Sequence, residues 1–138
     1  MDFKLHHYRK GELMDRLGNI IAEIVRFRDE REWSQFHTPK NLATALSIEA
    51  AELQELMLWK TDREVAELLA TGDGKAQLTA EVADVLIFSL LLCERVGVDP
   101  VDAMRLKLRE NAAKYPVELA KGNATKYSHL KADTRKEG

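Results

Sequence analysis

Apolar residues recur along most of the chain with the 3.6-residue period of an amphipathic helix. Four segments show this pattern, at about residues 11–32, 39–59, 76–96 and 100–114. Pro39 and Pro100 suit the first turns of the second and fourth segments, and Gly97 is a typical residue just beyond a helix end. No segment of useful length alternates with the period of two that a half-buried strand needs. The pattern predicts an all-α fold, built as a four-helix bundle.

The segment between the second and third predicted helices is polar, at about residues 62–75. Gly72-Asp73-Gly74 predicts a turn within it, and a short helical piece at residues 64–70 is an open alternative. The C-terminal tail is polar, and we expect weak structure there. With 138 residues the chain suits one compact domain, with its core at about residues 11–116 and the tail at 118–138.

The third predicted helix is apolar on nearly every side from Val82 to Cys93. The other helices of a lone bundle would cover only about two thirds of such a helix, which predicts a homo-oligomer. The apolar run is about half the length of a membrane span, and the first residues lack the apolar stretch of a secretory signal. Cys93 is the single cysteine and cannot form an intramolecular disulfide. We therefore expect a cytoplasmic protein without a membrane partner.

The formal net charge of −2 is too balanced for a protein held to DNA by counterion release, so we expect no nucleic-acid partner. Charge is nevertheless unevenly distributed along the chain. Residues 49–84 hold nine acidic and three basic side chains, whereas residues 105–126 hold six basic and two acidic ones. This separation indicates an acidic half that binds metal and a basic half that binds an anionic ligand.

Two pairs of acidic residues lie among apolar positions of the second and third predicted helices. Glu49 and Glu52 are three residues apart. Glu81 and Asp84 have the same spacing, so each pair shares one helix face. A single pair of this kind is usually a solvated surface, but two pairs within apolar stripes point toward the interior. Buried carboxylates are costly without a cation, and oxygen ligands favour Mg²⁺, with Mn²⁺ as the alternative.

One face of the fourth predicted helix carries phosphate-binding residue types. Helical spacing relates Lys107, Asn111, and either Lys114 or Tyr115. This face therefore offers ammonium and amide donors to a phosphate. The alternative is that the lysines only complement the C-terminal end of the helix dipole.

Two tryptophans flank the second predicted helix. Trp33 and Trp59 lie beside polar residues, where an aromatic ring can be half exposed and stack on a base, and core packing is an equal alternative. His37 is able to donate to a phosphate or a base carbonyl, although a loop histidine is more often solvated. Arg28 and Arg31 have no spacing that separates them from ordinary surface charge.

The acid motif resembles the metal-binding motif of the MazG-like all-α nucleoside triphosphate pyrophosphohydrolases, and the surrounding segments are similar to the dCTP pyrophosphatase subfamily. The acid motif is moderately specific, whereas the tryptophan-flanked segments and the Lys-Asn-Tyr-Pro element are together quite specific. The resemblance covers about residues 20–130. The segments that carry it most clearly are residues 31–37, 39–42, 58–62, 84–87 and 107–116.

The resemblance implies an obligate helical homo-oligomer, a dimer or a dimer of dimers. It also implies Mg²⁺-dependent cleavage of a nucleoside triphosphate between the α and β phosphates, which gives a nucleoside monophosphate and pyrophosphate. The implied metal ligands and catalytic residues are Glu49, Glu52, Glu81 and Asp84. Either Glu49 or Glu52 is expected to act as the general base. The residues expected to contact the substrate are Trp33, His37, Trp59, Lys60, Phe88, Lys107, Asn111, Lys114 and Tyr115.

Two positions depart from the dCTP enzymes. Phe88 stands where they carry a tyrosine, and Ile24 stands where they carry a histidine. We expect dCTP to be favoured over purine triphosphates, with looser discrimination among pyrimidines because Phe88 lacks a hydroxyl group. One alternative is the same chemistry on dUTP, a modified nucleotide or phosphoribosyl-ATP. Another is a non-catalytic helical oligomer that binds nucleotides.

Overall fold

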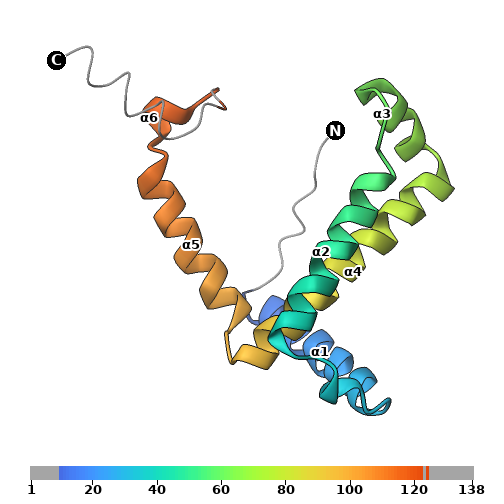
Figure 1. Ribbon diagram of the computed structural model, residues 1–138. Helices are drawn as coiled ribbons and strands as arrows, with labels where there is room; N and C mark the ends of the chain where they lie inside the picture. The colour runs from blue at the N-terminus through green and yellow to red at the C-terminus, as the bar shows by residue number, and fades with distance from the viewer. Residues whose placement is uncertain (1–9, 123, 125–138) are drawn as a thin grey trace. The chain divides into compact units, whose positions relative to one another are not determined.

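The computed structural model describes residues 10–122 and 124, with side chains from residue 16 onward. No strand occurs among these residues, which confirms the all-α prediction. The elements in chain order are α1 (Lys10–Asp29), the 3-10 helix η1 (Trp33–Gln35), α2 (Pro39–Glu55), α3 (Asp62–Ala70), α4 (Gly72–Val96), α5 (Pro100–Lys114) and α6 (Val117–Ala120) (Figure 1).

The chain divides into a first unit, Met1–Val98, and a second unit, Asp99–Gly138, and each is described by itself. In the first unit α2 and α4 pack side by side, α3 packs against α4, and α1 also contacts α4 (Figure 1). Among the described side chains, Leu42 of α2 and Leu91 of α4 are the buried apolar ones, at 1% and 4% exposure. The single domain and the four-helix bundle stay predictions, because α5 belongs to the second unit.

Side-chain caps fix where two of these helices begin. The Thr38 hydroxyl accepts a hydrogen bond from the backbone N–H of Asn41 at 3.2 Å, and Pro39 occupies the first turn of α2. At α3, Thr61 and Glu64 form a capping box, in which the Thr61 backbone N–H donates to the Glu64 carboxylate at 2.7 Å. This box makes the polar segment helical from Asp62, two residues earlier than the short piece considered from sequence.

The turn predicted at Gly72-Asp73-Gly74 is wrong, because these residues form the first turn of α4. The Thr71 hydroxyl caps this turn by accepting from the Gly74 backbone N–H at 3.0 Å. Gly74 lies so close to α3 that a β-carbon would overlap the carbonyl oxygen of Leu68. Glycine is therefore needed here for the close approach of two helices.

Two helices end earlier than the apolar period predicts. Helix α1 ends at Asp29, and Glu32 then adopts a left-handed φ of 56°. Helix α2 ends at Glu55, and Trp59 adopts a left-handed φ of 63°. A non-glycine residue in this region cannot continue a right-handed helix, so the chain turns on both sides of α2 although apolar residues continue.

The predicted weakly structured tail begins with the short helix α6. Residue 123 and residues 125–138 lie outside the described part of the chain. For most of the tail the expectation therefore stays a prediction.

Helix α4 is long and apolar enough to cross a membrane by length and composition alone, with a mean hydropathy of 1.7 in its most apolar window. Core helices of soluble proteins pass the same test, so this is weak evidence. Glu81 and Asp84 lie in the middle of the helix, where carboxylates would be costly in lipid. The cytoplasmic location without a membrane partner stays a prediction.

Candidate active site

Three glutamates from two neighbouring helices bring their carboxylates together. Glu49 and Glu52 lie one turn apart on α2, and Glu81 lies on α4, which packs beside it. Each offers one carboxylate oxygen, and these three oxygens all lie within 4.8 Å of one another. Glu49 and Glu81 are half-buried, and Glu52 is exposed. We call these three residues the acid cluster.

The electrostatics of the acid cluster favour a cation. Burial raises the pKa of the Glu49 carboxyl, and the negative charges of Glu52, Asp84 and Glu81 raise it further. Asp84 is thus close enough to act on Glu49, although it is not one of the three converging ligands. Converging oxygen donors with uncompensated charge fit a hard divalent ion such as Mg²⁺. All four predicted acids therefore lie in one region.

A pocket of about 480 Å³ lies between α1, α4 and the segment that joins α1 to α2. Its apolar lining residues are Ile20, Ile24, Phe27, Ile87, Phe88 and Leu91. Its other lining residues are Glu23, Arg28, Trp33, His37 and Asp84. Asp84 both lines this pocket and acts on Glu49, so the pocket adjoins the acid cluster. An apolar pocket with a few polar groups is the usual form of a small-molecule site.

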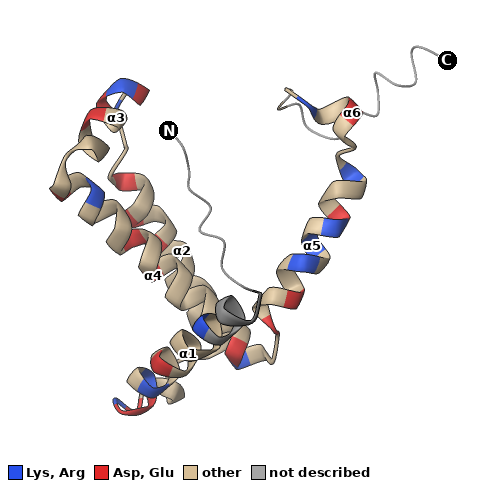
Figure 2. Cartoon of the chain, turned by 180° about the vertical axis from the view of Figure 1, so that it is seen from behind, with Lys and Arg blue, Asp and Glu red and all other residues tan. Residues whose placement is uncertain are grey.

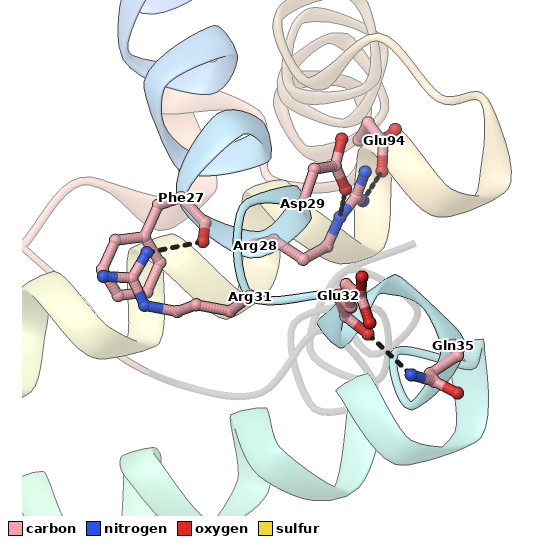
Figure 3. A network of polar contacts seen from close by, with 7 residues as sticks. All are labelled: Phe27, Arg28, Asp29, Arg31, Glu32, Gln35 and Glu94. Carbon is pink, nitrogen blue, oxygen red and sulfur yellow. Dashed lines mark hydrogen bonds and ion pairs between the residues drawn. The ribbon is translucent and has the colours of Figure 1, made fainter.

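Arg28 anchors the wall of this pocket and was missed by sequence reasoning. Its side chain is 8% exposed, and it donates to the carboxylates of Asp29 and Glu94 at 2.7 Å each (Figure 3). The bond to Glu94 fastens the end of α1 to α4. The available signal was its position four residues after Ile24, on the apolar stripe of α1.

Trp33 lies at the pocket, in contact with the Phe27 ring. Its ring meets Phe27 edge-on, with centroids 5.9 Å apart and planes at 77°. The Arg31 guanidinium lies 3.6 Å from the centroid of the Phe27 ring and donates to the Phe27 carbonyl at 2.9 Å (Figure 3). Trp33 is nevertheless 44% exposed, so its ring is partly accessible.

His37 contributes an imidazole whose surroundings favour the neutral form. Burial lowers its pKa, and the positive charge of Arg28 lowers it further. The Nδ1 atom is enclosed and has no hydrogen-bond partner among the described residues. His37 therefore lies at the predicted site, and its role in substrate binding stays a prediction.

Trp59 and Lys60 lie in the turn between α2 and α3, and neither lines the pocket. Trp59 is 94% exposed. Within one chain the structure therefore does not bring the two predicted tryptophans together around a base. Their shared role in base binding stays a prediction.

The predicted phosphate contacts Lys107, Asn111, Lys114 and Tyr115 all lie in the second unit. Basic residues recur along α5, while acidic residues mark α2 and α4 (Figure 2). Lys107 pairs with Glu110 at 2.9 Å, and Lys114 lies 5.5 Å from the centroid of the Tyr115 ring. The contact of these residues with the acid cluster stays a prediction.

Metal-free protein is expected to become more stable as pH falls from neutral through the raised pKa of Glu49. The folded state keeps this proton above the ordinary value of 4.5, so the stabilisation is present at low pH and is lost as pH rises. Glu49→Gln should therefore flatten the dependence and raise the melting temperature at neutral pH. Melting curves in EDTA across this range test the effect, and equal slopes for both proteins would contradict it.

A family model described as the MazG-like family matches residues 44–130. This match spans more than half of the chain and includes the acid cluster and Asp84. The chain therefore belongs to the MazG-like family.

Similar proteins include dCTP pyrophosphatase 1 of Mus musculus, 41% identical over 121 residues that make up 88% of this chain and 71% of that protein. The protein of that name from Homo sapiens is 41% identical over 114 residues, 83% of this chain and 67% of the relative. The crystal structure of a pyrophosphatase from Archaeoglobus fulgidus DSM 4304 matches with a TM-score of 0.65 and 41% identity, covering 82% of this chain and 99% of that one. Family and relatives together identify the chain as a nucleotide pyrophosphohydrolase.

Proposed function

We propose that the protein is a Mg²⁺-dependent nucleoside triphosphate pyrophosphohydrolase. Its substrate is dCTP or a related pyrimidine triphosphate, cleaved between the α and β phosphates to a nucleoside monophosphate and pyrophosphate. The observation that carries this proposal is the acid cluster, which adjoins an apolar pocket through Asp84. The relatives named dCTP pyrophosphatase support the choice of substrate.

The acid cluster and Asp84 would hold the metal beside the phosphates. Bound Mg²⁺ supplies charge neutralisation for the phosphates and lowers the pKa of a coordinated water. The oxygen of the attacking water forms a bond to the α phosphorus. At the same time, Glu49 or Glu52 accepts a proton from this water. The bond from the α phosphorus to the bridging oxygen breaks, and pyrophosphate leaves with that oxygen. The carboxylates then release the proton to solvent.

The apolar pocket would hold the base. Trp33 and Phe88 both line it and present aromatic surface on which a pyrimidine ring can stack. Lys107 and Asn111 of the second unit would contact the phosphates, with Lys114 and Tyr115 beside them on the same helix end. Trp59 and Lys60 are the remaining proposed contacts.

A hydrolysis screen of deoxynucleoside and ribonucleoside triphosphates, with identification of the products, tests this function. We expect nucleoside monophosphate and pyrophosphate from dCTP with Mg²⁺, and no product with EDTA. The enzyme could instead turn over dUTP, a modified pyrimidine triphosphate or phosphoribosyl-ATP rapidly and leave dCTP intact. That result would change the proposed substrate, while the proposed pyrophosphohydrolase reaction would stand. Absence of pyrophosphate from every substrate would favour the non-catalytic nucleotide-binding oligomer.

Trp33→Ala is expected to raise KM for dCTP by roughly tenfold and to lower kcat much less. Base stacking contributes roughly 1–3 kcal/mol, and the base does not change during phosphoryl transfer. Steady-state kinetics with dCTP, dTTP and dATP measure this effect, with Trp59→Ala as the comparison. An unchanged KM in both variants, or a preference of the parent enzyme for dATP, would place the base elsewhere.

We propose in addition that the enzyme is a homo-oligomer, a dimer or a tetramer. Val82 and Leu86 lie four residues apart on α4 and are 39% and 56% exposed, and Ile48 on α2 is 51% exposed. Val82 and Leu86 thus share one face of α4, and exposed apolar side chains that lie together commonly mark a protein interface. Light scattering at micromolar concentration should give a multiple of 15.7 kDa. A mass equal to that of one chain would contradict the proposal.

A further inference from the structure

The pocket contains few polar groups, and most of them already interact with other parts of the protein. Asp84 acts on the acid cluster, and Arg28 is paired with two carboxylates. The Nδ1 atom of His37 is enclosed, and Trp33 can only donate a hydrogen bond. None of these groups is a charged acceptor for an edge of the base that lies away from the acid cluster.

Glu23 is the remaining polar residue of the pocket lining. It lies on α1 and is exposed, and its carboxylate forms no hydrogen bond or ion pair with the described residues. The closest basic residue along the chain, Arg26, lies instead toward Glu30 at 3.9 Å. An ionised carboxylate is a hydrogen-bond acceptor and cannot donate. Among the described residues that line the pocket, Glu23 therefore offers a charged acceptor without a partner.

An unpaired carboxylate at the wall of a base pocket distinguishes between bases. A base that enters the pocket removes water from part of the carboxylate, and this cost is offset only if the base donates a hydrogen bond. The exocyclic amino group of cytosine is such a donor, whereas the corresponding carbonyl of uracil or thymine is an acceptor and is repelled. A carboxylate paired with the cytosine amino group is a known form of base recognition.

We infer that Glu23 is a specificity-determining residue that accepts a hydrogen bond from the exocyclic amino group of a cytosine base. This inference rests on the proposed function, because it places the base in the pocket. It names aminopyrimidine triphosphates as the substrate class and dUTP and dTTP as the substrates that are rejected. It also offsets the loss of the tyrosine hydroxyl at Phe88, from which the sequence predicts looser discrimination among pyrimidines.

The test compares three deoxynucleoside triphosphates. They are dCTP, dUTP, which has a carbonyl at position 4 and a proton on N3, and the 2-pyrimidinone analogue, which differs from dCTP only by hydrogen in place of the amino group. Wild-type enzyme should prefer dCTP over dUTP by at least tenfold in kcat/KM. Glu23→Gln, whose amide both donates and accepts, should reduce this preference by about tenfold. Glu23→Met should lower kcat/KM for dCTP and leave the analogue unchanged. Glu30→Gln, a change at the exposed acid facing Arg26, is the matched control and should behave as wild type.

The outcomes separate this inference from the proposed function. Absence of pyrophosphate from all substrates with the wild-type enzyme would overturn the proposed function itself. Hydrolysis with an unchanged ratio of dCTP to dUTP in both Glu23 variants would leave the function standing and overturn the role of Glu23. An equal loss for all three substrates would also overturn it, because that loss reflects the shape or charge of the site rather than contact with the amino group.

Discussion

Glu49→Gln is expected to lower the rate of pyrophosphate release by at least about a hundredfold while the helical fold is retained. The glutamine has the same shape but removes one charge from a shared metal site, and metal-held phosphates contribute several kcal/mol to such reactions. The same loss is expected for Glu52→Gln, Glu81→Gln and Asp84→Asn. Release of pyrophosphate from dCTP at saturating Mg²⁺ measures the effect, and circular dichroism checks the fold.

Glu55→Gln is the matched control for the acid variants. Glu55 lies on the same helix as Glu49 and Glu52 but is exposed and does not belong to the acid cluster. The activity of the Glu55→Gln variant should equal that of the wild type. Near-normal turnover in any of the four acid variants would show that the residue concerned is not required for metal binding or catalysis.

The acid cluster could be predicted from sequence because it depends on two local features, the spacing of the acidic residues and the apolar stripe around them. The spacing of three residues places Glu49 and Glu52 on one face of a helix, and the apolar stripe around them requires that face to meet another element. The strongly apolar helix that carries Glu81 is the natural neighbour for that face. The apolar period also identifies the long helices of the first unit. It does not predict where α1 and α2 end.

Features that depend on contact between elements could not be predicted. Gly72 and Gly74 have the composition of a turn, yet they form the first turn of α4, which the Thr71 hydroxyl caps and in which Gly74 lies against Leu68 of α3. Arg28 has the character of surface charge until Glu94, 66 residues later in the chain, lies beside it. Periodicity carries no information on such pairings, because it describes one element at a time.

The residues of the base site could also not be identified from sequence alone. Sequence identified Trp33 and Trp59 as equivalent aromatic candidates, but only Trp33 lines the pocket. Glu23 could not be identified from sequence, because a lone glutamate on a helix is usually solvated. Its significance arises from the pocket beside it and from the absence of a partner among the described residues.

Leu86→Lys is expected to dissociate the oligomer and to lower activity by at least about tenfold. Leu86 is 56% exposed in the single chain, so a lysine there does not disturb the core of the protomer. In an assembly that covers this face of α4, the same lysine would be buried without a partner, which costs several kcal/mol. Light scattering and kinetics on one preparation should show both losses together.

The choice of Leu86 follows from the burial of its neighbours on α4. A charge at Leu91, which is 4% exposed, would unfold the protomer and leave the assembly untested. Gln77→Lys adds the same charge to an exposed polar position of α4 and should change neither mass nor activity. If Leu86→Lys keeps the wild-type mass, the interface lies on another face. If it becomes a single chain with full activity, the site is complete within one chain, and the assembly serves stability instead of catalysis.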